Sequence, residues 1–166
     1  MSKNEQLFIR LYDQYAVQIY RFIFLKTSSP QDAEDLTSEV FFRFWKNNQE
    51  ADNARALLYR IANNLVVDFY RKKDSQEVMF IEANKGVLAE AIGETDLRGK
   101  AELDSEMKQI VQSLDKMKDE YQNIIIWHYL EDLSIKEIAQ ILDKSQGTVR
   151  VLIHRALNSL KKKLKS

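Results

Sequence analysis

The chain has 166 residues with no cysteine, one proline and four glycines. The lack of cysteine excludes disulfides and thiolate metal sites, and the scarcity of proline and glycine favours helices. The formal net charge is zero, from 25 basic and 25 acidic residues, but these charges are segregated along the chain. The N-terminus lacks a signal-peptide core and no apolar run approaches a membrane span, so we expect a cytoplasmic protein that is not inserted in a membrane.

Two helices are predicted in the first part of the chain. Apolar residues at helical spacing indicate a first helix over Gln6–Lys26. The clearest start signal follows, because Ser29 is a good N-cap and Pro30 suits the first helical position. This second helix is expected to reach about Lys46, before a polar loop over Asn47–Asn53.

The second helix carries an acidic stripe beside an aromatic residue. Asp32, Asp35 and Glu39 lie outside its apolar arc, with Phe42 beside them and Trp45 at the edge of the arc. An exposed aromatic residue bordered by acids is typical of an interface anchor. Helical geometry equally allows Phe42 and Trp45 to be core residues and the acids to be solvated. No base, nucleophile or metal ligand accompanies the acids, so they are not catalytic candidates.

A third helix is predicted over Ala54–Lys73, and one narrow sector of it is polar. Arg60, Asn64, Asp68 and Arg71 share this sector. Such groups can bind base edges or phosphates, or they can form a solvated i, i+4 network. The residues alone favour the network. The helix ends in a basic run, formed by Arg71, Lys72 and Lys73.

The stretch 74–104 differs in composition from both of its neighbours. It holds eight acids against three bases, and three of the four glycines. This composition predicts a flexible acidic linker and not a domain. The basic segments on either side of the linker suggest two nucleic-acid contacts instead of one.

Two further helices are predicted over Ala101–Met117 and Asp119–Leu130. Ile124 and Tyr129 are among the residues expected to pack in the second of them. His128 is interpreted as a residue at the edge of the core, and with two histidines in the chain we expect no histidine metal site.

The C-terminal part has the pattern of a helix-turn-helix. The segment Leu133–Leu142 has apolar residues at helical spacing, and Asp143 and Lys144 break it. Ser145 can then cap a second helix, whose apolar face includes Val149, Leu152, Ile153, Ala156, Leu160 and Leu164. Two short amphipathic helices joined by a tight turn, the second cationic outside, make this motif.

Charge supports a DNA-binding role for that second helix. No acid follows Asp143, whereas seven bases do, so a phosphate backbone should bind here with a steep salt dependence. Gly147 allows close approach of the backbone to a ligand, and Val151 suits a thymine methyl group. The alternative is an ordinary amphipathic helix with a solvated lysine tail, which leaves the two-helix pattern unexplained.

Three segments together resemble the extracytoplasmic-function class of bacterial sigma factors. Asp32–Trp45 is similar to the polymerase-binding helix of this family, Ala56–Lys73 to its promoter-melting helix, and Leu133–Leu160 to its closing helix-turn-helix. The resemblance implies an all-α fold with two small helical domains, sigma domain two over residues 1–73 and sigma domain four over residues 105–166, joined by the linker at 74–104.

The resemblance also implies a function: a non-enzymatic factor, without cofactor or small-molecule substrate, that binds core RNA polymerase and directs it to promoters. An anti-sigma factor is a further expected partner. The residues implied to bind the clamp helices of the largest polymerase subunit are Asp32, Asp35, Glu39, Phe42 and Trp45. Those implied to bind promoter DNA are Arg60, Asn64, Asp68, Arg71, Lys72 and Lys73 at the minus-ten element, and Lys144, Gln146, Gly147, Thr148, Arg150, Val151, His154 and Arg155 at the minus-thirty-five element. A helix-turn-helix regulator that is not a polymerase subunit is the alternative.

The chain departs from the family pattern at a few positions. Asp143 stands where glycine is common, so we expect a tight or strained turn. Met117 and Lys118 stand where Leu-Pro is usual. Val151 and Leu152 are more apolar than the usual pair, which changes the expected base preference.

Overall fold

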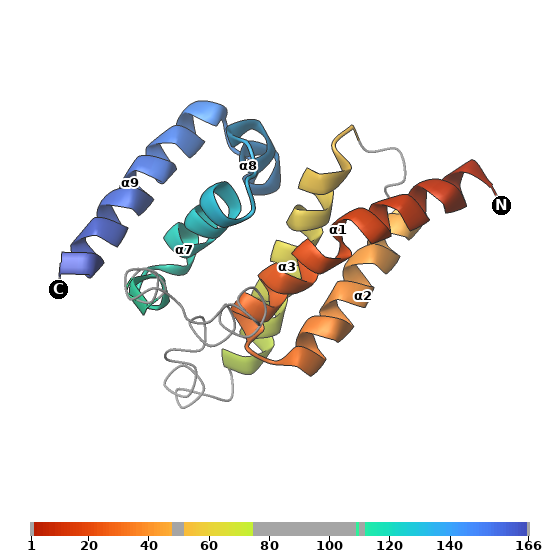
Figure 1. The fold of residues 1–166 in the computed structure, drawn as a ribbon, viewed down its shortest axis with the longest axis horizontal. Helices are drawn as coiled ribbons and strands as arrows, with labels where there is room; N and C mark the ends of the chain where they lie inside the picture. Colours follow the sequence, from red (N-terminus) through yellow and green to blue (C-terminus); the bar gives the residue numbers. More distant parts are fainter. Residues whose placement is uncertain (1, 48–51, 75–108, 110–111, 166) are drawn as a thin grey trace, which may run out of the picture. The chain divides into compact units, whose positions relative to one another are not determined.

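The computed structural model describes residues 2–47, 52–74, 109 and 112–165. All regular structure in these residues is helical, which confirms the predicted fold class (Figure 1). The chain divides into two compact units. The first contains α1 (Lys3–Thr27), α2 (Pro30–Asn47) and α3 (Ala54–Asp74), and the second contains α7 (Asp119–Ile125), η1 (Ile126–Leu130), α9 (Gln146–Lys165) and most of α8 (Ile135–Leu142). Apart from Asp74, the predicted linker lies outside the described residues, as does most of the predicted helix before Met117.

The first helix begins earlier than its apolar pattern predicts. Helix α1 spans Lys3–Thr27, because Ser2 and Glu5 form a capping box that periodicity does not reveal. The Ser2 hydroxyl accepts from the Glu5 backbone N–H at 3.2 Å, and the Glu5 carboxylate accepts from the Ser2 backbone N–H at 3.4 Å. Both bonds satisfy amides that a helix start leaves without an intrahelical partner.

Side-chain caps also begin the next two helices. Helix α2 spans Pro30–Asn47, and the Asp32 backbone N–H donates to the Ser29 hydroxyl at 3.2 Å, as predicted. Helix α3 spans Ala54–Asp74. Its cap is Asn53, whose side-chain carbonyl accepts from the Ala56 backbone N–H at 2.9 Å. An asparagine just before a helix is a recognised start signal, so the sequence contained this cap.

The three helices of the first unit enclose one hydrophobic core. Each of them packs on the other two. The Phe22 and Tyr59 rings meet edge to face with their centroids 5.9 Å apart. The residues fully buried here include Ile19, Phe22, Ile23, Val40, Leu58, Tyr59 and Ala62. Because this core lies on the faces of α1 and α2 that pack together with α3, the opposite edges of α1 and α2 are exposed to solvent.

The predicted helix over Asp119–Leu130 is interrupted by a π-helical turn. Helix α7 spans Asp119–Ile125, and η1 spans Ile126–Leu130. The Glu131 backbone N–H donates to the Ile126 carbonyl at 2.8 Å, five residues back instead of four. Because a π turn has more residues than an α turn, the side chains after it face a different way. Trp127 is fully buried, and the prediction that Tyr129 packs inside is wrong because its side chain is exposed.

The helix-turn-helix forms as predicted. Helix α8 spans Ile135–Leu142 and begins with a capping box of Ser134 and Glu137. Asp143 follows in the left-handed region with φ of 56°, which aspartate tolerates better than most residues other than glycine. Helix α9 spans Gln146–Lys165 and packs on α7. The Thr148 backbone N–H donates to the Ser145 hydroxyl at 3.1 Å, which confirms the predicted cap.

Candidate nucleic-acid and protein interfaces

Helix α9 separates a buried face from an exposed one. Val149, Leu152 and Ala156 are buried. Val151 is 48 % exposed, although valine is apolar. All eight residues expected at the minus-thirty-five element are exposed: Lys144, Gln146, Gly147, Thr148, Arg150, Val151, His154 and Arg155. The structure therefore brings this predicted set together on one surface of the helix-turn-helix.

Gly147 is not required by the fold of the free chain. A Cβ built at this position would meet the Ser145 hydroxyl oxygen at 3.9 Å, an ordinary contact distance. The fold therefore accommodates a larger residue here, and the backbone is left uncovered on the exposed face. An uncovered backbone lets a ligand approach closely, as predicted for DNA.

Two side-chain hydrogen bonds organise the exposed face of α9. The Ser145 and Thr148 hydroxyls lie 2.9 Å apart, so Thr148 is held at the start of the helix. The Asn158 amide nitrogen lies 3.3 Å from His154 Nε2. Because the amide nitrogen can only donate, Nε2 is the acceptor and Nδ1 carries the ring proton in this arrangement.

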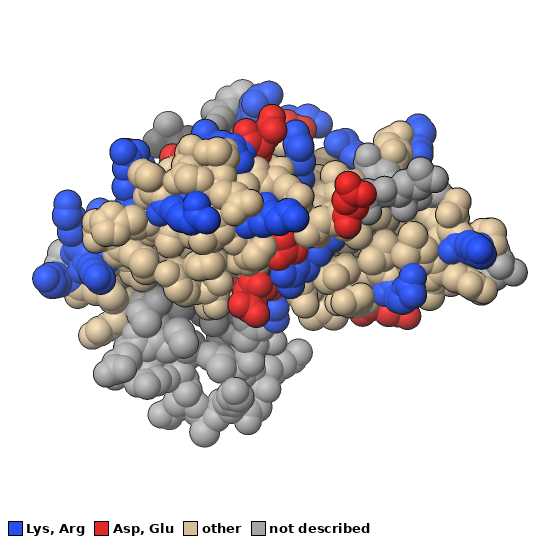
Figure 2. Space-filling view, turned by 90° about the horizontal axis from the view of Figure 1, so that it is seen from above, with Lys and Arg blue, Asp and Glu red and all other residues tan. Residues whose placement is uncertain are grey.

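The charge of α9 is uniformly positive. Its last turn carries Lys162, Lys163 and Lys165, and no acid follows Asp143. Figure 2 shows Lys and Arg side chains gathered at the left-hand end, where α9 lies in Figure 1. Positive charge at a helix C-terminus is favourable for the helix, and it also attracts a phosphate backbone.

The polar sector of α3 is exposed, and its side chains do not bond to one another. Arg60, Asn64, Asp68 and Arg71 are all exposed. In the part of the chain that the structure describes, no hydrogen bond or ion pair joins these four side chains. The structure therefore shows no such network among these four side chains. The sector instead presents amide, carboxylate and guanidinium groups to solvent.

The basic end of α3 contacts the acidic start of α2. Lys72 is exposed and Lys73 is half-buried. Lys73 Nζ lies 3.9 Å from an Asp32 carboxylate oxygen and 4.4 Å from the centre of the Phe69 ring. One residue expected to bind polymerase thus pairs with one expected to bind DNA.

Two neighbouring phenylalanines of α2 have opposite environments. Phe41 is 2 % exposed and belongs to the core, whereas Phe42 is 57 % exposed. Trp45 is half-buried, with its ring centre 5.0 Å from that of Phe8 on α1. The interpretation of Phe42 as a core residue is therefore wrong, and Trp45 lies at the margin of the core. Asp35 is exposed, and Glu39 pairs with Arg43 at 2.9 Å.

An apolar depression, which we call the aromatic hollow, lies along the seam of α1 and α2. It measures about 530 Å³. Ile9 and Tyr12 are each 45 % exposed, so α1 contributes apolar surface that the sequence interpretation assigned to no interface. The lining residues are Glu5, Phe8, Ile9, Tyr12, Ser38, Phe41, Phe42 and Trp45.

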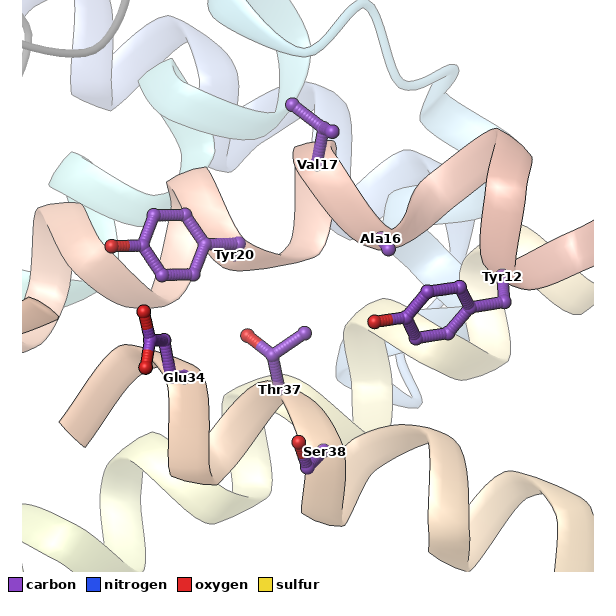
Figure 3. Close-up of a pocket in the computed structure, with 7 residues that line it drawn as sticks. All are labelled: Tyr12, Ala16, Val17, Tyr20, Glu34, Thr37 and Ser38. Atoms are coloured by element: carbon purple, nitrogen blue, oxygen red, sulfur yellow. The ribbon is translucent and has the colours of Figure 1, made fainter. Parts of the chain in front are cut away.

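A second depression, the polar hollow, lies on the same seam and measures about 510 Å³. Figure 3 shows the Tyr20 ring on α1 near the Glu34 carboxylate on α2. Burial, and secondly the Glu34 carboxylate, raise the pKa of the Tyr20 hydroxyl above its ordinary value. The lining residues are Tyr12, Ala16, Val17, Tyr20, Glu34, Thr37 and Ser38.

The described residues show neither a metal-binding cluster nor a membrane span. Within them, no three His, Cys, Asp or Glu side chains gather to hold a metal ion. No helix among them is both long and apolar enough to cross a bilayer. His128 lies at the edge of the core, where its Nδ1 donates to the Leu133 carbonyl at 3.0 Å.

Comparison with known proteins gives consistent matches to both units. The family models Sigma-70 region 2 and Sigma-70, region 4 match residues 11–76 and 107–160. The ECF RNA polymerase sigma factor SigW of Bacillus subtilis is 30 % identical over 170 residues, which cover 98 % of this chain and 91 % of that relative. The RNA polymerase sigma factor YlaC of the same species is 29 % identical over 157 residues, covering 93 % and 90 %.

A solved structure has the same fold. The sigma factor RpoE in complex with the anti-sigma factor NepR, from Bartonella quintana, matches with a TM-score of 0.69 and 18 % identity, covering 95 % of this chain and 96 % of that chain. The exposed sector of α3 lies in the region 2 match, and the exposed face of α9 lies largely in the region 4 match. The chain therefore belongs to the extracytoplasmic-function family of RNA polymerase sigma factors.

Proposed function

We propose that the two units of this sigma factor bind polymerase and promoter DNA through three exposed surfaces. Residues 1–73 serve as domain two, which binds core polymerase and the minus-ten element, and residues 105–166 serve as domain four, which binds the minus-thirty-five element. The observation that carries the proposal is the exposed face of α9, which presents Gln146, Arg150 and Arg155 together with an uncovered backbone at Gly147.

Helix α9 reads bases in the major groove. Its exposed N-terminal half carries Gln146, Thr148 and Arg150, and in a helix-turn-helix this part of the second helix contacts base edges. A guanidinium at Arg150 suits the acceptor pair of guanine, and the exposed Val151 suits the thymine methyl group. The lysines of the last turn contact phosphates and supply affinity without sequence specificity.

Helix α3 holds the minus-ten element in its opened form. The side chains of Arg60, Asn64, Asp68 and Arg71 make no bonds to one another, so their polar groups remain available to bases and phosphates. Taking a base out of the duplex stack costs a few kcal/mol, which such contacts must offset.

The exposed edge of α2 binds the clamp helices of the largest polymerase subunit. Phe42 supplies an apolar anchor, and Asp35 and Glu39 supply the charged rim. Exposed aromatic residues surrounded by polar ones are typical centres of protein interfaces. The ion pair of Asp32 with Lys73 places Asp32 at the margin of this surface.

The factor supplies promoter choice and strand-opening contacts, whereas the polymerase performs the chemistry, so the chain itself is no enzyme and works in the cytoplasm with the polymerase. An anti-sigma factor regulates it by binding the same surfaces. Support for such a partner comes from the RpoE structure, in which a sigma factor is bound to an anti-sigma factor.

A reconstituted transcription reaction tests the proposal. The purified chain should form a complex with core polymerase and support initiation at specific promoters. Sequencing of the DNA that polymerase binds after overexpression of the chain would identify these promoters. A chain that binds operator DNA but does not co-purify with core polymerase would be a helix-turn-helix regulator instead.

A further inference from the structure

We infer that Asn158 is a positioning residue for DNA binding, which fixes the tautomer of His154 so that the ring presents its Nδ1 N–H to a backbone phosphate of the minus-thirty-five element. This inference rests on the proposed role of α9 in binding that element. It gives Asn158, which is not among the residues predicted to bind the element, a role that acts through His154.

The hydrogen bond between Asn158 and His154 sets the position of the ring proton. Within the described residues His154 has one hydrogen-bond partner, the Asn158 amide nitrogen, which lies 3.3 Å from Nε2. An amide nitrogen can only donate, so Nε2 accepts and Nδ1 carries the proton. In a neutral imidazole, the bond made by one nitrogen decides which nitrogen is protonated. Asn158 therefore selects the Nδ1–H tautomer.

The selected N–H is available to a ligand. His154 and Asn158 are both exposed, and the Nδ1 N–H has no acceptor among the residues that the structure describes. Phosphate oxygens only accept hydrogen bonds, so a neutral ring with a bare Nδ1 would place one lone pair against another. The tautomer that Asn158 selects is the one that can bind phosphate through Nδ1.

The position of His154 along α9 favours a phosphate over a base edge. His154 lies eight residues after Gln146, the first residue of α9, and so about two turns into the helix. In a helix-turn-helix the N-terminal residues of the second helix contact base edges. A phosphate contact further along would fix the register of α9 in the groove without selecting a base.

Nitrogen-15 NMR of the histidine rings in the full chain tests the tautomer directly. The chain has two histidines, and His154→Phe identifies which ring signals belong to His154. The spectra are recorded at pH 8, above the range in which histidine side chains ordinarily gain a proton. The wild type should carry the proton on Nδ1 of His154, and Asn158→Ala should shift part of it to Nε2. Asn158→Gln, which keeps an amide donor, should restore the Nδ1 proton.

Titration of the holoenzyme with a promoter fragment at pH 8 tests the role in DNA binding. His154→Phe, which keeps a ring but removes the N–H, should weaken binding by about threefold to tenfold, as for the loss of one hydrogen bond. Asn158→Ala should weaken it by about twofold to fivefold, because only part of the population then has the competent tautomer. Asn158→Gln should bind as the wild type does.

Salt dependence separates this contact from a charged one. Both tautomers of the ring are neutral, so Asn158→Ala should leave the slope of log affinity against log salt unchanged. The matched variant Arg155→Gln removes an exposed charge from the neighbouring position, and it should make the slope shallower by about one.

A double-mutant cycle shows whether Asn158 acts through His154. In the His154→Phe background, Asn158→Ala should have no further effect. The inference is wrong if the two losses are additive, if wild-type His154 carries its proton on Nε2, or if the losses depend on one base pair of the element. If the wild-type holoenzyme does not bind the minus-thirty-five element at all, the proposed function is wrong, whereas the NMR result on the free chain still stands. Circular dichroism of each variant verifies that its helical content is unchanged.

Discussion

Phe41 and Phe42 provide a test of which side chains of α2 hold the fold and which bind a partner. Phe41 is 2 % exposed and meets Tyr12 with ring centres 4.9 Å apart, whereas Phe42 is 57 % exposed. Phe41→Ala should destabilise the first unit by about 3–5 kcal/mol, because it removes buried apolar surface and leaves a cavity. For a unit of this size each kcal/mol lowers the melting temperature by about 4–8 °C.

Phe42→Ala should give the opposite profile. Less than half of the Phe42 surface is covered, so the substitution should lower the free energy of unfolding by about 1 kcal/mol. Its affinity for core polymerase should fall about tenfold or more, as expected for an aromatic anchor at the centre of an interface.

Urea unfolding and core-polymerase titration together test this reasoning. Two transitions should be fitted, because the two units need not unfold together. Phe41→Leu, which keeps most of the apolar volume, serves where Phe41→Ala does not fold. The reasoning fails if Phe42→Ala destabilises the unit as much as Phe41→Ala does, or if it leaves the affinity for core polymerase unchanged.

Three further substitutions test the DNA-binding surfaces. Arg150→Ala should weaken binding of the holoenzyme to the minus-thirty-five element by about 1–3 kcal/mol, the value of a bidentate contact with guanine; an unchanged mobility-shift titration would contradict this contact. Asn64→Ala should slow strand opening more than initial binding, because Asn64 would contact bases only after they unstack. Permanganate footprinting measures the opened strand, and a signal that falls only in proportion to promoter occupancy would refute this role. Ser145→Ala should destabilise the second unit by about 1 kcal/mol through loss of the α9 cap, whereas Ser145→Asp, which can still accept the Thr148 N–H, should unfold at nearly the wild-type urea concentration.

Signals local to a helix were predictable from the sequence. The cap at Ser29 and the cap at Ser145 each depend on a residue three positions away, and both form as expected. The exposed face of α9 follows from helical periodicity, because the apolar residues that define its opposite face are unambiguous. Asp143, where we expected a tight or strained turn, adopts the left-handed conformation.

Features that depend on tertiary packing were not predictable. The π-helical turn over Ile126–Leu130 uses backbone hydrogen bonds that span five residues, such as that from the Glu131 N–H to the Ile126 carbonyl, and the composition of the helix does not reveal it. Ile9 and Val17 are apolar residues of an amphipathic helix, and periodicity alone does not distinguish those that meet a core from those that line an open groove. The apolar surface of α1 therefore could not be predicted without knowing how α2 packs against it.

The contact between Asp32 and Lys73 creates a thermodynamic linkage between two surfaces of the first unit. A partner that neutralises the Asp32 carboxylate leaves the end of α3 more positive, and therefore more attractive to phosphate. By reciprocity, DNA that engages Lys73 leaves Asp32 more available to a cationic partner, with the same coupling free energy. Because the pair is partly exposed, this coupling is about 1 kcal/mol at most, enough to favour joint over separate occupancy by a small factor.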